Sequence, residues 1–322
     1  MLRSRWYIAL LVAAGTATAG LAQDSAELKW KFEKGKTFYQ EMTTRTEQKM
    51  KVMGQDVGQT QEQTFIFSWT PKEQDPKGNW VIVQKIEGIK MKIDIGGNPI
   101  SYDSTKDTNA NSPLADFFKA IVGSEFTLTL SPDYKVVDIK GKDDFLKKLI
   151  QTHQNMEHIL KVVLSDEALK QMADPAFGAV PNKTVKKGES WERTSTLNMG
   201  PIGKYDNTYK YTYEGQDDKD KNLAKIKADT TLKYLPPDAN AAGNAGLGFT
   251  IKSADLKSSD SNGTILFDTK KGQMVSSNMH LKLSGKLTID VNGQASDVDL
   301  QQTQDTTVKQ TDENPLSPPK KN

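Results

Sequence analysis

The segment Thr64-Phe65-Ile66-Phe67-Ser68-Trp69 places three aromatic side chains on one face of an extended chain, because successive strand residues point to opposite faces. The same period of two recurs at residues 28–32, 89–95, 205–213 and 281–283. Such alternation is typical of antiparallel strands with one buried and one solvated face. Threonine, lysine and glutamine fill the remaining positions, which we expect to face outward. Asn-Gly and Lys-Gly pairs between such segments supply hairpin-type turns.

Three segments in the middle of the chain follow a helical pattern instead. Residues 113–122 begin with a proline, which suits the first turn of a helix. Residues 143–164 carry apolar side chains on one helical stripe, and residues 166–173 end before Pro175. We therefore expect a mainly β protein of the α+β class. Its long antiparallel strands form one curved, half-barrel-like sheet or two related sheets, with the central helices packed on the concave face.

Residues 1–22 have the pattern of an export signal. Two arginines precede an apolar run, and small residues follow it. We expect cleavage after Ala22, with cleavage after Ala19 as the alternative. The apolar run is shorter than the roughly 20 residues that a membrane-spanning helix needs, which disfavours an uncleaved anchor. The mature chain is thus expected in the periplasm or at the cell surface, without a transmembrane span.

The composition excludes several classes of protein. The 322 residues include no cysteine and only three histidines, so a disulfide framework, a zinc knuckle and a cysteine nucleophile are ruled out. The 43 basic residues nearly balance the 41 acidic ones. Arg3 and Arg5 belong to the export signal, so the mature chain is formally neutral. This balance disfavours a nucleic-acid partner, whose binding depends on phosphate neutralisation.

The two strand-rich flanks resemble each other, which suggests an internal duplication. Lys34-Gly35-Lys36-Thr37-Phe38 matches Lys187-Gly188-Glu189-Ser190-Trp191, and residues 64–69 match residues 208–213, in the same order. We accordingly divide the chain into five parts. They are a signal peptide (1–22), a first β-rich half (23–141), a central helical segment (142–181), a second β-rich half (182–308) and a disordered tail (309–322).

No catalytic or metal-binding constellation stands out. His153 and His158 are five residues apart and do not stack on one helical face, and His280 has no partner in sequence. Acidic clusters at residues 217–220 and 290–299 suit polar hairpin turns better than calcium loops, because the second cluster lacks the bidentate glutamate and the first contains a lysine. No nucleophile elbow, phosphate loop or dinucleotide fingerprint is present. We expect no enzyme activity, no cofactor and no metal.

Aromatic residues on the strands are the strongest candidate binding feature. In one interpretation they line a concave apolar surface that binds a lipid or another hydrophobic ligand. In the other they simply fill the core between sheet and helices, where aromatic strand residues usually lie. The candidate lining residues are Trp30, Phe65, Phe67, Trp69, Trp191, Tyr209 and Tyr211.

The segment that joins the helices to the second half carries a family resemblance. A helix at residues 164–172 precedes Pro181-Asn182-Lys183-Thr184-Val185 and the strand start Lys187-Gly188-Glu189-Ser190-Trp191. This order resembles a family of exported bacterial proteins that is catalogued only as a domain of unknown function. The resemblance implies no catalytic residues. The predicted architecture is also distantly similar to the half-barrels of lipoprotein-localisation factors and lipoprotein carriers, at the level of fold alone.

The expected function is that of an exported, non-enzymatic envelope protein. It would bind a hydrophobic ligand or an envelope component in an aromatic-lined concave sheet. The alternative is a structural or interaction module with a filled core and no ligand. An envelope hydrolase is the third and weakest candidate, because no catalytic set is visible. The identity of the ligand and the oligomeric state do not follow from the sequence.

Overall fold

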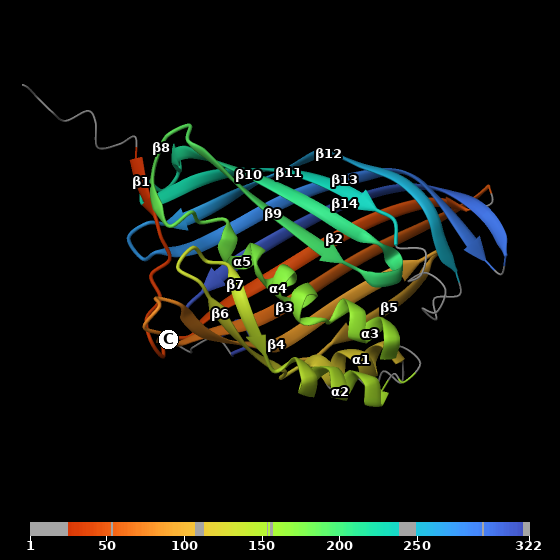
Figure 1. Ribbon diagram of the computed structural model, residues 1–322, viewed down its shortest axis with the longest axis horizontal. Helices are drawn as coiled ribbons and strands as arrows, with labels where there is room; N and C mark the ends of the chain where they lie inside the picture. The colour runs from red at the N-terminus through yellow and green to blue at the C-terminus, as the bar shows by residue number, and fades with distance from the viewer. Residues whose placement is uncertain are drawn as a thin grey trace, which may run out of the picture.

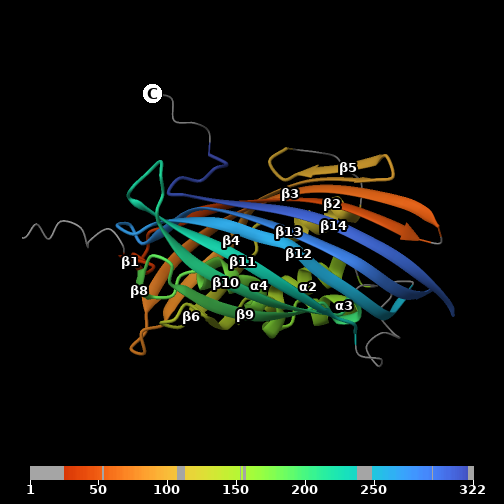
Figure 2. The same cartoon turned by 90° about the horizontal axis from the view of Figure 1, so that it is seen from above.

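A computed structural model describes residues 25–52, 54–106, 113–152, 154, 157–237, 249–291 and 293–317. The expected signal peptide and residues 238–248 lie outside these residues. The chain is dominated by long strands that curve around a small group of helices (Figures 1 and 2). The strands are β1 (Ser25–Leu28), β2 (Phe38–Val52), β3 (Gln55–Gln74), β4 (Trp80–Ile95), β5 (Asn98–Asp103), β6 (Glu125–Leu130), β7 (Val136–Lys140), β8 (Lys183–Lys186), β9 (Ser190–Asn198), β10 (Lys204–Gln216), β11 (Leu223–Leu235), β12 (Thr250–Asp268), β13 (Gln273–Val291) and β14 (Gln294–Thr311).

Twelve of these strands form a single antiparallel sheet. Its order is β7-β6-β4-β3-β2-β14-β13-β12-β11-β10-β9, with β5 paired to β4, while β1 and β8 form a separate two-stranded sheet. The two halves of the chain are joined by β2 and β14, whose register runs from Tyr39 opposite Thr311 to Val52 opposite Val298. The expectation of long antiparallel strands in one curved sheet is confirmed, and the alternative of two related sheets is wrong, because both halves of the chain share the twelve-stranded sheet.

The helices occupy the middle of the chain, as the patterning predicts. They are α1 (Pro113–Ile121), α2 (Lys142–Thr152), α3 (Glu157–Val163), α4 (Asp166–Ala173) and the short α5 (Pro175–Gly178), with a 3-10 turn at Gly200–Ile202. The Ser165 hydroxyl caps α4 by accepting a hydrogen bond from the Ala168 amide at 3.4 Å. The prediction of one helix over residues 143–164 is wrong, because α2 and α3 are separate. Of the four residues between them, only Gln154 is among the described residues.

The C-terminal boundary also needs a correction. Disorder was expected from Lys309, but β14 continues to Thr311, because Lys309 and the two residues after it pair with β2. Beyond the strand, the side chain of Leu316 lies against Gly88, so closely that a Cβ built on this glycine would lie 2.8 Å from Leu316 Cδ1. The chain therefore keeps ordered contacts with the sheet past the predicted end of the fold.

The core lies between the concave face of the sheet and the helices. Phe145 and Leu149 of α2 and Phe177 of α5 belong to one buried cluster with Trp69 and Ile82 of the sheet. The packing of the central helices on the concave face is thereby confirmed. In the described part of the chain, no helix has the length and apolar character needed to cross a membrane.

The sheet does not close into a barrel, and helix α4 covers the opening. The strand path ends at β7 and β9, and α4 contacts both of these edge strands. Across the same opening, Arg193 of β9 donates a hydrogen bond to the carbonyl oxygen of Asp133, in the turn between β6 and β7. The Asp174 carboxylate, at the end of α4, accepts a hydrogen bond from the Val136 amide of β7 at 3.2 Å. A covered edge of this kind has fewer free backbone groups for pairing with another chain.

Candidate functional site: a cavity on the concave face

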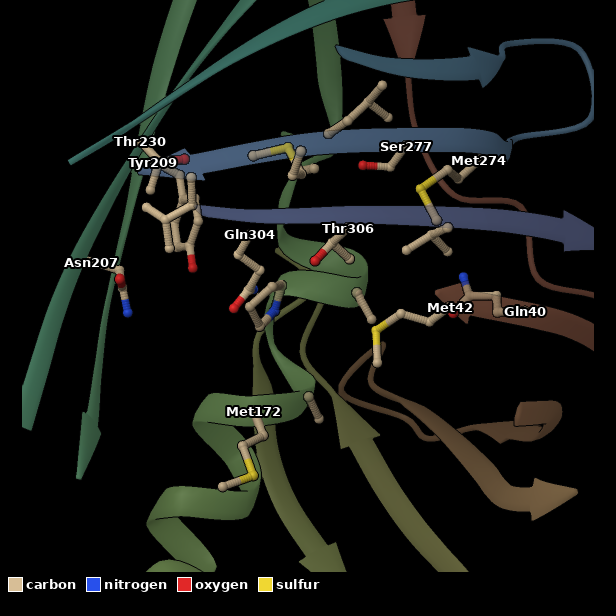
Figure 3. Close-up of a pocket in the computed structure, with 18 of the residues that line it drawn as sticks. Gln40, Met42, Met172, Asn207, Tyr209, Thr230, Met274, Ser277, Gln304 and Thr306 are labelled. Atoms are coloured by element: carbon tan, nitrogen blue, oxygen red, sulfur yellow. The ribbon is translucent and has the colours of Figure 1, made fainter. Parts of the chain in front are cut away.

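A cavity of about 360 Å³ lies between the concave face of the sheet and helices α4 and α5 (Figure 3). This volume falls within the range of roughly 300–1,000 Å³ that is usual for small-molecule sites. The walls come from strands of both halves of the chain, so the continuous sheet is what assembles the site. Met172 of α4 is 45% exposed, which places it where the cavity meets solvent.

The walls are mostly apolar. Most lining residues from the strands are alternate residues, because every second side chain of a strand faces the concave side. The apolar lining residues are Met42, Phe67, Trp69, Met172, Ala173, Pro175, Ala176, Ala179, Tyr209, Tyr211, Leu232, Ile265, Met274, Met279, Leu281 and Val308. Small residues on the helical side leave the space, and large residues on the strand side bound it.

Four of the seven predicted lining residues border the cavity. Phe67 and Trp69 come from β3, and Tyr209 and Tyr211 come from β10. The two tyrosine rings are stacked, with centroids 6.2 Å apart and an interplanar angle of 10°. Burial raises the pKa of both phenols, so both stay neutral at physiological pH.

The other three predicted residues lie elsewhere in the core. Trp30 packs edge-on against Phe177, and its indole N–H donates a hydrogen bond to the Phe177 carbonyl oxygen at 3.2 Å. Phe65 lies on the same concave face as Phe67 and stacks on it at a centroid distance of 5.7 Å, but it does not border the cavity. Trp191 donates a hydrogen bond from its indole N–H to the Ala179 carbonyl oxygen at 3.2 Å, which ties β9 to the segment after α5. These three side chains support the walls and do not border the cavity.

Two polar atoms of the lining are buried without a partner. Among the described residues, neither the Trp69 indole N–H nor the Thr230 hydroxyl makes a hydrogen bond. Trp69 is only 2% exposed, so water does not readily reach its N–H group. A buried donor without an acceptor costs about 1–3 kcal/mol. Both residues border the cavity, where a ligand oxygen would relieve this cost.

The remaining lining residues are polar but uncharged. They are Gln40, Gln84, Asn207, Thr230, Ser277, Gln304 and Thr306, several of which are drawn in Figure 3. His280 also borders the cavity, but its ring is bound to Asp305 at 2.6 Å between Nδ1 and Oδ1, at a pair of positions on the outer face. The described lining therefore contains no aspartate, glutamate, lysine or arginine.

The aromatic pattern alone did not reveal two groups of lining residues. Met42, Met172, Met274 and Met279 surround the cavity, and methionine side chains adapt readily to ligands of different shape. Gln304 and Thr306 face inward, which contradicts the expectation that glutamine and threonine fill outer positions. Inward polar residues are tolerated here because both side chains are partly exposed, so their polar groups keep access to solvent or to a ligand.

The other candidates for chemistry make ordinary structural contacts. The Asp217 carboxylate accepts hydrogen bonds from the amides of Lys219 and Asp220, at 3.0 and 3.2 Å, and so forms a turn. Asp290 accepts one from the Gly293 amide at 2.8 Å. His158 is exposed on α3, and His153 lies outside the described residues. Among the described residues no group of three or more histidine, aspartate or glutamate side chains could hold a metal ion.

Comparisons with solved structures give distant likenesses only. The structure titled "Lipid-protein interactions in lipovitellin" matches at a TM-score of 0.45 and 11% identity. That match covers 89% of this chain but only 26% of the lipovitellin chain, so this chain spans about a quarter of its length. OccK5 (OpdH) of Pseudomonas aeruginosa matches at a TM-score of 0.26 and 7% identity, over 88% of this chain and 99% of the other. At TM-scores below 0.5, neither structure informs on the ligand or activity of this chain.

No curated protein matches the chain. A family model does match, over residues 77–274, which is more than half of the sequence. The match extends from the start of β4 to the start of β13 and includes all five helices, so it contains much of the cavity wall. The resemblance to a domain of unknown function is thereby confirmed, and the chain belongs to the Family of unknown function (DUF6263).

Proposed function

We propose that this chain is an exported, non-enzymatic envelope protein that binds a hydrophobic ligand in the cavity between the concave sheet and helices α4 and α5. The observation that carries the proposal is the cavity itself, about 360 Å³ in volume and lined mainly by apolar side chains. The stacked tyrosines and the four methionines offer a large apolar contact surface to such a ligand.

The space on the concave face supports the proposal over a filled core. Protein interiors are close-packed, with few voids larger than a water molecule. Here a space of about 360 Å³ remains beside the core and meets solvent at Met172. A structural module gains nothing from such a space, whereas a binding protein uses it for its ligand.

Export is the second part of the proposal. It is supported by the basic, apolar and small-residue pattern of residues 1–22. The absence of cysteine agrees with a fold that relies on burial for its stability.

Expression of the full chain in a bacterial host tests the proposed export. The protein recovered from the periplasmic fraction should have the intact mass of a chain that begins at Gln23. Retention of the whole chain in the cytoplasm would contradict the proposed export.

Ligand binding is tested with N-phenyl-1-naphthylamine, an uncharged probe that fluoresces in apolar sites. We expect saturable binding by the purified wild-type protein, after delipidation under denaturing conditions and refolding. Ala176→Phe should lower the affinity at least tenfold, because the partly buried Ala176 lines the cavity and the new ring would fill it. The matched control is Ala295→Phe, at an exposed position near the β13–β14 turn.

Native mass spectrometry of protein purified from its own envelope gives an independent readout. A bound small molecule that is released by organic solvent would support the proposal. A clean apo mass, together with no probe binding by the wild type, would favour the structural module without a ligand. Equal affinities of the two phenylalanine variants for the probe would show that the probe binds outside this cavity.

A further inference from the structure

A patch of uncharged polar side chains continues the concave face beyond the cavity. It consists of the inward-facing positions of residues 44–48 on β2, 59–63 on β3 and 302–306 on β14, which we call the glutamine patch. The registers place these positions opposite one another, for example Thr46 opposite both Gln61 and Gln304. All of them are glutamine or threonine, with three positions on each of the three adjacent strands.

The outer face of the same segments has a different composition. Between the inward positions lie Arg45 and Glu47 on β2, Glu62 on β3 and Asp305 on β14. Arg45 and Glu62 form an exposed ion pair, with 3.0 Å between Nε and Oε2. If the inward face were merely solvated, we would expect it to carry charged side chains, as the outer face does. The inward positions of the described strands β4, β3, β2, β14 and β13 carry none.

Most polar groups of the glutamine patch are free to bind a ligand. Gln61 donates to Gln63 at 3.0 Å, and Thr44 shares a hydrogen bond with Thr306 at 3.2 Å. In the described part of the chain, the side chains of Gln48, Gln59, Gln302 and Gln304 make no hydrogen bond to protein, and the Thr46 hydroxyl makes none. Each free glutamine amide offers both a donor and an acceptor.

The glutamine patch is continuous with the cavity. Gln304 and Thr306 belong to both, and Figure 3 draws them among the residues that line the cavity. The charged groups close to the buried tyrosines are already engaged. Arg193 binds the Asp133 carbonyl oxygen, and the Asp174 carboxylate binds the Val136 amide. A ligand that extends from the cavity along β14 therefore meets amides and hydroxyls, and no free charge.

The size of the glutamine patch suits a sugar-sized group. Alternate strand residues are about 6.6 Å apart and neighbouring strands about 4.8 Å apart, so three positions on three strands cover about 13 by 10 Å. From this juxtaposition we infer that the ligand is an amphiphile with an uncharged, hydroxyl-rich head. The head binds the glutamine patch, and the apolar tail occupies the cavity. An ionic head would lose its hydration there without meeting an opposite charge, which is unfavourable.

This inference rests on the proposed binding function, so its test separates the two. Dodecyl maltoside, dodecanoate and dodecyltrimethylammonium share one alkyl chain and differ in the charge of the head. Their affinities are measured by displacement of N-phenyl-1-naphthylamine below the micellar concentration. We expect the maltoside to bind about tenfold more tightly than either ionic amphiphile, which corresponds to a difference of one or two hydrogen bonds.

Gln302→Leu should lower the maltoside affinity about three- to tenfold and should not weaken binding of the apolar probe itself, because Gln302 belongs to the glutamine patch and not to the lining of the cavity. The matched control is Gln301→Leu, the same change on the same strand at an exposed outer position. Unchanged probe binding shows that Gln302→Leu is still folded. Three results would overturn the inference even if the apolar cavity still binds the probe. They are equal affinity for the three amphiphiles, a preference for an ionic head, and equal effects of the two leucine variants. A wild-type protein that binds no probe would overturn the proposed function together with this inference.

Discussion

The indole of Trp69 on β3 and the ring of Phe177 on α5 meet edge to face, with ring centroids 5.1 Å apart and an interplanar angle of 88°. The contact joins the middle of the sheet to the short helix that closes the concave face. Phe177 is fully buried and also packs edge-on against Trp30 and Phe32. Trp69 is therefore part of the core on one side and a wall of the cavity on the other.

Phe177→Ala should lower the free energy of unfolding by about 3–5 kcal/mol, the usual loss for a buried phenylalanine. The change removes the ring that meets three aromatic side chains and leaves a void below the cavity. Urea unfolding followed by tryptophan fluorescence measures the effect. Phe249→Ala is the matched control, because Phe249 is 37% exposed, and it should cost less than about 1 kcal/mol. Similar losses for the two variants would show that α5 is not firmly packed on the sheet.

Thr230→Val tests the unpaired hydroxyl in the cavity wall. Valine has nearly the same shape as threonine, so the change removes a buried polar group that has no partner. We expect stability to stay equal or to rise by up to about 1 kcal/mol, and affinity for dodecyl maltoside to fall several-fold. Thr231→Val, at an exposed position on the opposite face of β11, should change neither quantity by much. A clear loss of stability in Thr230→Val would mean that the hydroxyl is satisfied in the free protein.

The sequence predicted the fold well where the pattern is local. The alternation at residues 64–69 lies within β3, and the helix predicted at 166–173 matches α4. The pairing of β2 with β14 could not be predicted, because it joins Tyr39 to Thr311 across almost the whole chain. The break between α2 and α3 was also missed, since Leu149 and Leu160 are both buried and keep the apolar stripe continuous on either side of it.

The site was predicted in part, for a physical reason. Aromatic strand residues are recognisable from sequence, and Phe67 and Tyr209 do line the cavity. A glutamine on a strand has the same appearance whether it faces solvent or an internal surface. The sequence alone therefore does not assign Gln304 to either face, and the register with Thr46 shows that it faces the concave side. The space itself results from small residues such as Ala173 and Ala176, which carry no sequence signal.

Arg193 should hold the open edge of the sheet against the β6–β7 turn. Its side chain is 16% exposed, and its guanidinium donates to the Asp133 carbonyl oxygen and lies 3.9 Å from the Asp133 carboxylate. Arg193→Gln should lower the free energy of unfolding by about 1–2 kcal/mol, through loss of a charge-assisted hydrogen bond. In this variant, amide hydrogen exchange measured by mass spectrometry should be accelerated more in β9 and β7 than in β2 or β14. Uniform acceleration across all strands would indicate general destabilisation instead of an opened edge.

Alkaline pH should destabilise the protein through its buried tyrosines. Burial raises the pKa of Tyr134 from 10.0 to about 12, and Tyr134 is only 4% exposed with its hydroxyl 3.2 Å from Asn182 Oδ1. Because the folded state favours the neutral phenol, this stabilisation is complete below pH 10 and is lost as pH rises from 10 to 12. A shift of this size corresponds to about 2–3 kcal/mol.

Tyr134→Phe should therefore make the pH dependence of unfolding shallower in this window, by up to about 1.4 kcal/mol per pH unit. Urea titrations at several pH values measure the slope. Tyr234 has its pKa raised to about 12 by burial in a separate cluster at the far end of the sheet, so Tyr234→Phe should have a similar and independent effect. The double variant should then lose the sum of the two contributions. A wild-type slope retained in both single variants would mean that these phenols titrate alike in the folded and unfolded chains, and that burial does not hold them neutral.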